Sequence, residues 1–287
     1  MSTAIDMLVS NADYHADTTV VSNTGKEDFR KSQTDYYRRY VSREVQPPLP
    51  TPALRIGIAA HEFVLEPDVA IDKYVCAPKC DKRTTAGKAA YAAFLESSEG
   101  KTVLELDEYD LVRAIQTACR QNKLVRNLLD RPGEVEHSYK WQDSATGLWL
   151  KSRPDKTFSE AFNGRDVIFD LKTCEDASPE GFQYACRTHG YHRTAAFRID
   201  GHFVRTGNQA HYLFAAVSKR NLEVGLYDLQ PEEIELGRKQ NRSILRRMAR
   251  CYETGIWEPD WSTRVNSLRY PAFMFNDQWE VSDGDGN

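Results

Sequence analysis

Two strand-like segments around a turn signal most constrain what this chain can fold into. Residues 148–158 and 167–173 have the pattern of β-strands, and the Asn163-Gly164 dipeptide between them favours a tight turn. We therefore expect an antiparallel hairpin. Successive side chains of a strand point to opposite faces, so Asp170 and Lys172 share one face and Leu171 points to the other.

The residues leave two registers of this hairpin open. A turn centred between positions 162 and 163 places Asp155 opposite Asp170. A turn centred on the Asn163-Gly164 dipeptide places Asp155 opposite Lys172 instead. Either register gathers the three charged side chains on one face, with cross-strand Cβ atoms about 5 Å apart.

This cluster of charges has two interpretations, a catalytic metal site or an exposed surface hairpin. Two adjacent carboxylates raise each other's pKa unless a cation lies between them, and hard oxygen ligands suit Mg²⁺ or Mn²⁺. A lysine beside such a metal can orient an attacking water or offset charge on a phosphoryl transition state, which describes a nuclease. The alternative is an exposed hairpin that carries a solvated Asp–Lys pair.

The rest of the chain predicts helices packed on a sheet, that is an α/β (α+β) fold. His61 lies on an apolar stripe with Leu54, Ile58 and Leu65, so we expect that stripe to be buried. The predicted order is helices, a three-strand meander, helices, a strand pair and a final helix. Helices are expected at 27–41, 52–65, 85–97, 107–129, 178–201 and 231–254, and further strands at 135–141, 212–217 and 222–229.

Composition excludes several classes of protein. The chain has 38 Lys and Arg against 42 Asp and Glu, a net charge of -4, which argues against a binder that works through bulk positive charge and leaves room for a local basic groove. No run approaches the roughly 20 apolar residues that span a bilayer, and residues 1–10 do not resemble a secretory signal. The six Cys are scattered, and Cys76 with Cys80 is a single close pair, too few ligands for a zinc site.

Several motifs carry a resemblance to a known family. Pro154-Asp155 followed by Asp170-Leu171-Lys172 resembles the signature of the PD-(D/E)XK nuclease superfamily. The match extends to the RecE-type (exodeoxyribonuclease VIII-like) phage recombination exonucleases, which are related to lambda-type exonuclease. Its ordered motifs lie at residues 57–61, 65–67, 82–88, 153–156, 170–173 and 191–201.

The resemblance implies a restriction-endonuclease-like core, with a central mixed sheet flanked by helices. It implies catalytic roles for Asp155, Asp170 and Lys172, and it matches Glu136 to an extra acidic residue of the lambda-type enzymes. His61, Asp155, Asp170 and the backbone carbonyl of Leu171 match the metal ligands. The implied cofactor is Mg²⁺, with Mn²⁺ able to substitute.

One departure from the family pattern concerns DNA positioning. This branch usually has a Gln and, four residues later, a Tyr after the Asp-X-Lys motif, whereas this chain has Thr194 and Arg198. A threonine reaches less far, and an arginine can pair with phosphate. The expected DNA contacts are Lys82, Arg83, Arg193, Thr194 and Arg198.

The resemblance implies a Mg²⁺-dependent exonuclease that degrades one strand of linear double-stranded DNA 5′ to 3′. The 3′ overhangs would serve a single-strand annealing protein in homologous recombination. It further implies a ring-shaped homo-oligomer, a trimer or tetramer, encoded by a phage or prophage and acting in the bacterial cytoplasm. Two alternatives remain: a non-catalytic DNA-end-binding protein on a decayed nuclease fold, and a related PD-(D/E)XK endonuclease.

The expected domain organisation has three parts. Residues 1–50 form an N-terminal segment packed on the core, and the Pro-rich stretch at its end marks a boundary. Residues 51–275 form the exonuclease domain. Residues 276–287 form a disordered acidic tail.

Overall fold

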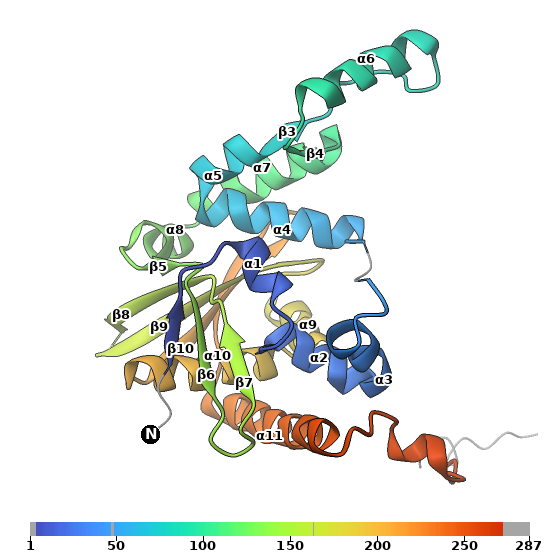
Figure 1. The fold of residues 1–287 in the computed structure, drawn as a ribbon. Coiled ribbons are helices and arrows are strands. Elements are labelled where there is room, and N and C mark those ends of the chain that lie inside the picture. The colour runs from blue at the N-terminus through green and yellow to red at the C-terminus, as the bar shows by residue number, and fades with distance from the viewer. Residues whose placement is uncertain (1–3, 47–48, 163, 272–287) are drawn as a thin grey trace, which may run out of the picture.

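A five-stranded sheet forms the centre of the structure, a computed structural model that describes residues 4–46, 49–162 and 164–271 (Figure 1). Its strand order is β11-β10-β9-β8-β5. The pair β9–β10 is parallel and the other pairs are antiparallel, so the sheet is mixed, as predicted. The strands are β5 (Glu134–Val135), β8 (Lys156–Phe162), β9 (Arg165–Cys174), β10 (Ala210–Ser218) and β11 (Val224–Asp228).

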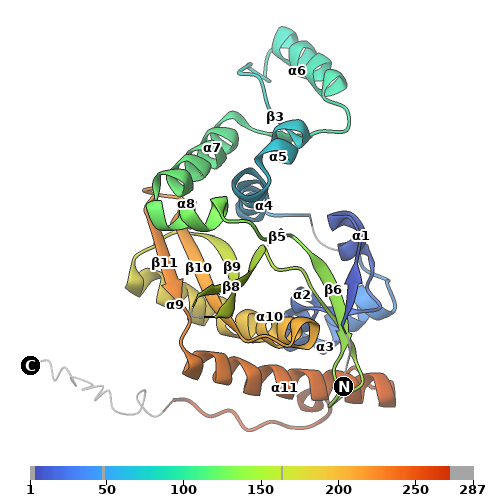
Figure 2. The same cartoon turned by 90° about the vertical axis from the view of Figure 1, so that its left-hand side faces the viewer.

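Helices cover both faces of this sheet, so residues 166–171 of strand β9 are buried on both sides (Figure 2). Phe169 and Leu171 pack in a core shared with α4 (Pro52–Leu65), α7 (Leu106–Gln121) and α8 (Lys123–Asp130). Ile168 packs on the other face with α9 (Pro179–His189) and α10 (Tyr191–Thr206). This arrangement confirms the predicted α/β (α+β) class with helices on a central mixed sheet.

A smaller sheet lies beside the central one and includes the N-terminal segment. Its order is β1-β6-β7-β2, with β1 (Ile5–Met7) paired to β6 (Ser138–Gln142) and β2 (Val21–Ser22) paired to β7 (Trp149–Ser152). Tyr139 and Trp141 of β6 share a core with Phe197 of α10 and Met248 of α11 (Pro231–Thr254).

The predicted three-strand meander is therefore wrong. Residues 148–158 form two strands in different sheets, because Pro154 lies between β7 and β8 and has no N–H to continue a ladder. The expected strand at 135–141 is likewise divided, with β5 in the central sheet and β6 in the smaller one. The break falls at Glu136, whose φ is 50°.

The hairpin β8–β9 combines the two registers that the residues left open. Phe162 pairs with Arg165, which is the register of a turn on Asn163-Gly164. A bulge between Phe158 and Phe162 then shifts the pairing, so that Lys156 lies opposite Phe169. Continued by one residue, this pairing sets Asp155 beside Asp170, so the end of the hairpin near Asp155 has the first of the two registers.

Three of the predicted helices have the expected bounds. The structure confirms 52–65, 85–97 and 231–254 as α4, α6 (Thr85–Ser97) and α11. Thr51 caps α4 and Gly255, with a φ of 70°, ends α11.

The three other predicted helices are each interrupted by an internal cap. Ser32 and Asn122 accept hydrogen bonds from the first turn of the next helix, and Gly190 has a φ of 70°. The segment 27–41 is thus divided into α2 (Asn23–Lys31), α3 (Gln33–Tyr36) and a π-helix (Tyr37–Val41), 107–129 into α7 and α8, and 178–201 into α9 and α10.

An arm built around α6 projects from the body (Figures 1 and 2). It follows α5 (Pro67–Lys73) and is closed at its base by two parallel strands, β3 (Tyr74–Cys76) and β4 (Thr102–Leu104). The remaining elements are α1 (Asn11–Ala16) and a 3₁₀ turn (Asp260–Thr263). Within the described ranges no helix is long and apolar enough to cross a membrane. The expected acidic tail, 276–287, lies outside the described residues.

Candidate active site

Three carboxylates lie in one row, with Glu136 directly after β5, Asp155 directly before β8 and Asp170 within β9. Val135 pairs with Lys156 in the β5–β8 ladder, so the next pair is Glu136 with Asp155, and the backbone N–H of Glu136 donates to the carbonyl of Asp155 over 3.0 Å. The β8–β9 ladder, continued by one residue in the same way, sets Asp155 beside Asp170. The row Glu136–Asp155–Asp170 is therefore set by strand register, with Asp155 in the middle.

Glu136 has a backbone conformation that side chains rarely adopt. Its positive φ costs about 1–3 kcal/mol, and such residues concentrate at functional sites. The carboxylate pairs with Arg153 Nε over 2.7 Å. Burial, together with the charge of Asp155, nevertheless raises the pKa of Glu136 to about 7. A cation beside Glu136 and Asp155 would relieve this repulsion.

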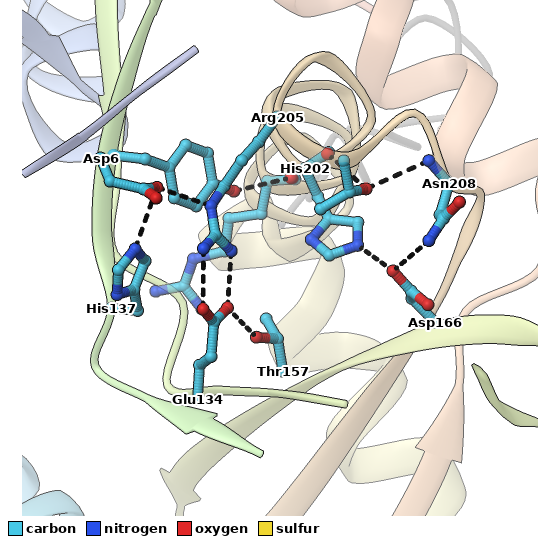
Figure 3. Close-up of polar contacts among 11 residues, drawn as sticks. Asp6, Glu134, His137, Thr157, Asp166, His202, Arg205 and Asn208 are labelled. Carbon is cyan, nitrogen blue, oxygen red and sulfur yellow. Dashed lines mark hydrogen bonds and ion pairs between the residues drawn. The ribbon is translucent and has the colours of Figure 1, made fainter. Parts of the chain in front are cut away.

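The residues on either side of Glu136 are held by ion pairs (Figure 3). Glu134 accepts from Arg205 of α10 over 2.7 Å, and His137 contacts Asp6 of β1 over 3.0 Å. Arg205 also donates to Asp6 over 2.7 Å, so one guanidinium joins the two contacts. These pairs anchor the segment that carries Glu136 to α10 and to the smaller sheet.

Two cations contact Asp170, which is fully buried at 0% exposure. Lys172 Nζ lies 2.5 Å from Asp170 Oδ2, and the Arg198 guanidinium donates to Asp170 Oδ1. Burial acts to raise the pKa of Asp170, but the charges of Arg198 and Lys172 outweigh it and hold that pKa well below its usual range. Asp170 is therefore ionised, and its charge is balanced by these side chains.

Asp155 divides its two oxygens between different partners. Oδ2 accepts a hydrogen bond from the backbone N–H of Leu171 over 2.8 Å and lies 3.2 Å from His61 Nδ1. Oδ1 accepts from Arg198 over 3.2 Å. One side of the carboxylate thus faces His61, and the other faces the guanidinium.

His61 faces a cavity of about 780 Å³ and not the core. The expectation that its apolar stripe is buried is wrong, because Leu54 and Ile58 are 55% and 40% exposed and line this cavity with His61. The buried face of α4 is formed by Ala59, Ala60, Phe63 and Val64. The His61 side chain is 25% exposed, and desolvation lowers its pKa, which favours the neutral ring that can ligate a metal.

The donors present fit a divalent metal ion. His61, Glu136 and Asp155 each place one ligand atom within 4.8 Å of the others. Within the part of the chain that the structure describes, this is the only such group of His, Cys, Asp or Glu side chains. Two carboxylates suit Mg²⁺ or Mn²⁺. Asp170 was expected among the ligands but is outside this group, since Arg198 and Lys172 engage its oxygens.

The structure brings together part of the predicted site. His61, Glu136, Asp155, Lys172 and Arg198 line the cavity. Asp170 lies behind them, and the Leu171 side chain is buried in the core while its carbonyl accepts from Lys172 Nζ over 3.3 Å.

Four of the predicted DNA contacts lie outside the cavity lining. Arg193 is 7% exposed and donates to both oxygens of Glu27, so its guanidinium is paired within the chain. Thr194 accepts from the side chain of Asn23 over 3.1 Å. Lys82 and Arg83 lie on the arm, where Lys82 pairs with Glu105 and the Arg83 side chain is 91% exposed.

Two further parts of the chain contribute to the cavity beyond the predicted catalytic, metal-binding and DNA-binding residues. Arg153, which holds Glu136, lies in the motif at 153–156, two residues before the expected metal ligand Asp155. The N-terminal segment contributes Tyr14, His15 and residues 22–24 to the cavity lining. No local pattern links these residues to the carboxylates, because the contact depends on the pairing of β2 with β7.

Comparisons with known proteins agree with this fold. A family model described as "PDDEXK-like domain of unknown function (DUF3799)" matches residues 22–271. A solved structure described as "Putative exonuclease" from Eubacterium rectale is 13% identical, with 96% of this chain and 100% of that chain covered and a TM-score of 0.61. At that identity the likeness shows the fold. A second structure, SSO0001, is 11% identical, with 64% of this chain and 84% of that chain covered and a TM-score of 0.28. No curated protein matches the sequence.

Proposed function

Because the chain belongs to the family described as "PDDEXK-like domain of unknown function (DUF3799)", we propose that it is a divalent-metal-dependent nuclease, and specifically an exonuclease on linear double-stranded DNA. One observation carries the proposal: the carboxylates of Glu136 and Asp155 adjoin His61 and Lys172 at the wall of one cavity. The name of the Eubacterium rectale structure supports the exonuclease assignment.

The residues divide the chemistry among them. His61, Glu136 and Asp155 would hold the ion, which when bound supplies a Lewis acid and lowers the pKa of a coordinated water. Lys172, whose ammonium group is fixed by Asp170, would orient the attacking water and offset the charge that develops on the phosphate. Arg153 keeps the Glu136 carboxylate in the cavity wall.

The finer parts of the proposal rest on the motif resemblance. Digestion runs 5′ to 3′ with Mg²⁺, leaves 3′ overhangs, and supplies a single-strand annealing protein in phage-type recombination. The active form is a ring-shaped homo-oligomer, a trimer or tetramer, in the cytoplasm of a bacterial host.

One assay tests the activity, its polarity and the endonuclease alternative. Purified protein is incubated with linear duplex labelled at the 5′ or the 3′ end, and with closed circular DNA, in Mg²⁺, Mn²⁺ or EDTA. We expect early release of the 5′ label in metal, no release in EDTA and intact circles. Absence of metal-dependent digestion would refute the enzyme, early release of the 3′ label would reverse the polarity, and cut circles would identify an endonuclease.

A second candidate function is supported by Arg198. Its guanidinium pairs with both Asp155 and Asp170, which are the expected metal ligands, so the fold also suits a non-catalytic protein that binds DNA ends. That function predicts a mobility shift of linear duplex over closed circles in EDTA, with no digestion in Mg²⁺ or Mn²⁺.

A further inference from the structure

Arg198 is held in one position by four oxygen atoms. Its Nη1 donates to Asp155 Oδ1 over 3.2 Å, to Asp170 Oδ1, and to the hydroxyl of Tyr212 over 3.1 Å, and its Nη2 donates to the carbonyl of Arg153 over 3.3 Å. The side chain is only 16% exposed. Acceptors from two strands, β9 and β10, and from the segment between β7 and β8 thus surround a guanidinium that comes from α10.

This position is where a second cation would bind. In two-metal sites the ions lie about 4 Å apart and are bridged by shared ligands. Asp155 is the middle member of the row, with His61 on its Oδ2 side and Arg198 on its Oδ1 side. The guanidinium therefore fills the place between Asp155 and Asp170 that a bridging arrangement would need.

The charged side chains around the carboxylate row also favour a single metal ion. The three carboxylates of the row each contact at least one of three cationic side chains, Arg153, Lys172 and Arg198. A second divalent ion would add two more positive charges to this cluster, with no further carboxylate in the row to balance them.

We propose that Arg198 takes the place of one metal ion, so that the chain binds a single divalent ion through His61, Glu136 and Asp155. Asp170 then acts as a positioning residue for Arg198 and Lys172 and does not ligate the metal. The inference rests on the proposed function only in taking the site to be a metal site; it does not require that the protein cleave DNA.

The test is metal stoichiometry in the absence of DNA. Mn²⁺ is titrated into the full chain and bound ions are counted by electron paramagnetic resonance of the free ion and by calorimetry. We expect one ion per chain in the parent protein. Two ions per chain in the parent would overturn the inference without any variant.

Substitutions at Arg198 test whether its guanidinium prevents a second ion from binding. Arg198→Met removes the charge at similar length, and we expect a second Mn²⁺ to bind. Arg198→Lys retains one positive charge and is the matched control, with one ion expected. A single ion in Arg198→Met with unchanged affinity would contradict the assignment.

Folding of the Arg198 variants is checked separately. Thermal melting in EDTA is expected to show a lower Tm for Arg198→Met, with a larger recovery on adding Mn²⁺ than in the parent, because the ion replaces the lost counter-charge. Asp170→Asn gives an independent readout, with Mn²⁺ affinity within about 3-fold of the parent, whereas Glu136→Gln should lose about 10-fold or more.

The outcomes separate this inference from the proposed function. One bound ion without DNA cleavage would keep the inference and refute the nuclease. Two bound ions with cleavage would keep the nuclease and refute the inference. No bound ion would refute both.

Discussion

Glu27 and Arg193 form a two-fold ion pair, with both carboxylate oxygens 2.8 Å from guanidinium nitrogens. The pair joins α2 of the N-terminal segment to the start of α10, in the helix that also carries Arg198. Burial acts to raise the pKa of Glu27, but hydrogen bonds from Arg193 and the charge of Lys26 outweigh it and lower that pKa to about 2.

We expect this pair to make stability depend on acid pH. The folded-state pKa of Glu27 lies below its ordinary value of 4.5, so the stabilisation is complete above pH 4.5 and is lost as the pH falls toward 2. The lowering of the Glu27 pKa from 4.5 to about 2 corresponds to roughly 3 kcal/mol of folding stability at neutral pH. Urea unfolding of Glu27→Gln should show about that loss at pH 7 and little difference from the parent near pH 2.

The control for this measurement is an exposed glutamate on the arm. Glu99→Gln should change the free energy of unfolding by less than about 0.5 kcal/mol at either pH. A Glu27→Gln protein whose deficit is as large at pH 2 as at pH 7 would show that the ion pair is not its origin.

Removing the lysine beside the carboxylate row should separate chemistry from metal binding. Lys172→Met eliminates the ammonium group that contacts Asp170, and we expect cleavage to slow by about 100-fold or more. Mn²⁺ binding should persist, because His61, Glu136 and Asp155 remain. Lys101→Met, at an exposed position on the arm, is the matched control; equal rates for the two variants would contradict the role of Lys172.

Removing the histidine should affect the metal and leave the fold intact. His61 faces the cavity and is partly exposed, so His61→Ala leaves no large internal void. We expect Mn²⁺ affinity to fall by about 10- to 100-fold with little change in Tm in EDTA. His211→Ala, on β10 and outside the cavity lining, should stay within about 3-fold of the parent affinity. Unchanged affinity in His61→Ala would remove His61 from the ligand set.

Two glycines should respond in opposite directions to the same substitution. A Cβ on Gly237 would lie 2.3 Å from the carbonyl oxygen of His192, where α10 and α11 cross, so Gly237→Ala should destabilise by about 1–3 kcal/mol. A Cβ on Gly57 would meet only Thr173 Oγ1, at 3.5 Å, so Gly57→Ala should stabilise α4 by about 1 kcal/mol. Chemical denaturation measures both, and a stabilising Gly237→Ala would show that the crossing is looser than described.

Local signals predicted much of the secondary structure. Thr51, which caps α4, and Gly255, which ends α11, are adjacent to these helices in the sequence. These two helix ends could therefore be predicted from residues close in the chain. Asn122 and Gly190 are equally local signals for a helix end. The apolar pattern continues through both positions, so periodicity alone predicts one helix where the structure has two, α7 and α8 at Asn122 and α9 and α10 at Gly190. The alternation along β9 likewise placed Asp170 and Lys172 on one face.

The site itself could be predicted only in part. Spacing and motif order identified five candidate residues, and the structure places them close together: Asp155, Asp170, Lys172, Glu136 and His61. The distinction between Asp155 and Asp170 was not accessible, since both match the same signature. In the structure Asp155 lies beside His61 and Asp170 lies beside Lys172, while Arg198, 28 residues after Asp170 in the chain, reaches both through the packing of α10 on the sheet.

The sequence by itself determined the class of fold, the hairpin and the residue types of a candidate metal site, because strand alternation, turn chemistry and helix caps act between residues close in the chain. Only the tertiary structure decided which carboxylates face the cavity, which are neutralised by arginine and lysine, and that Arg193 is buried against Glu27. The physical reason is that charge at a site is a sum over neighbours in space, and those neighbours come from β5, β8, β9, α4 and α10, which the fold alone brings within contact.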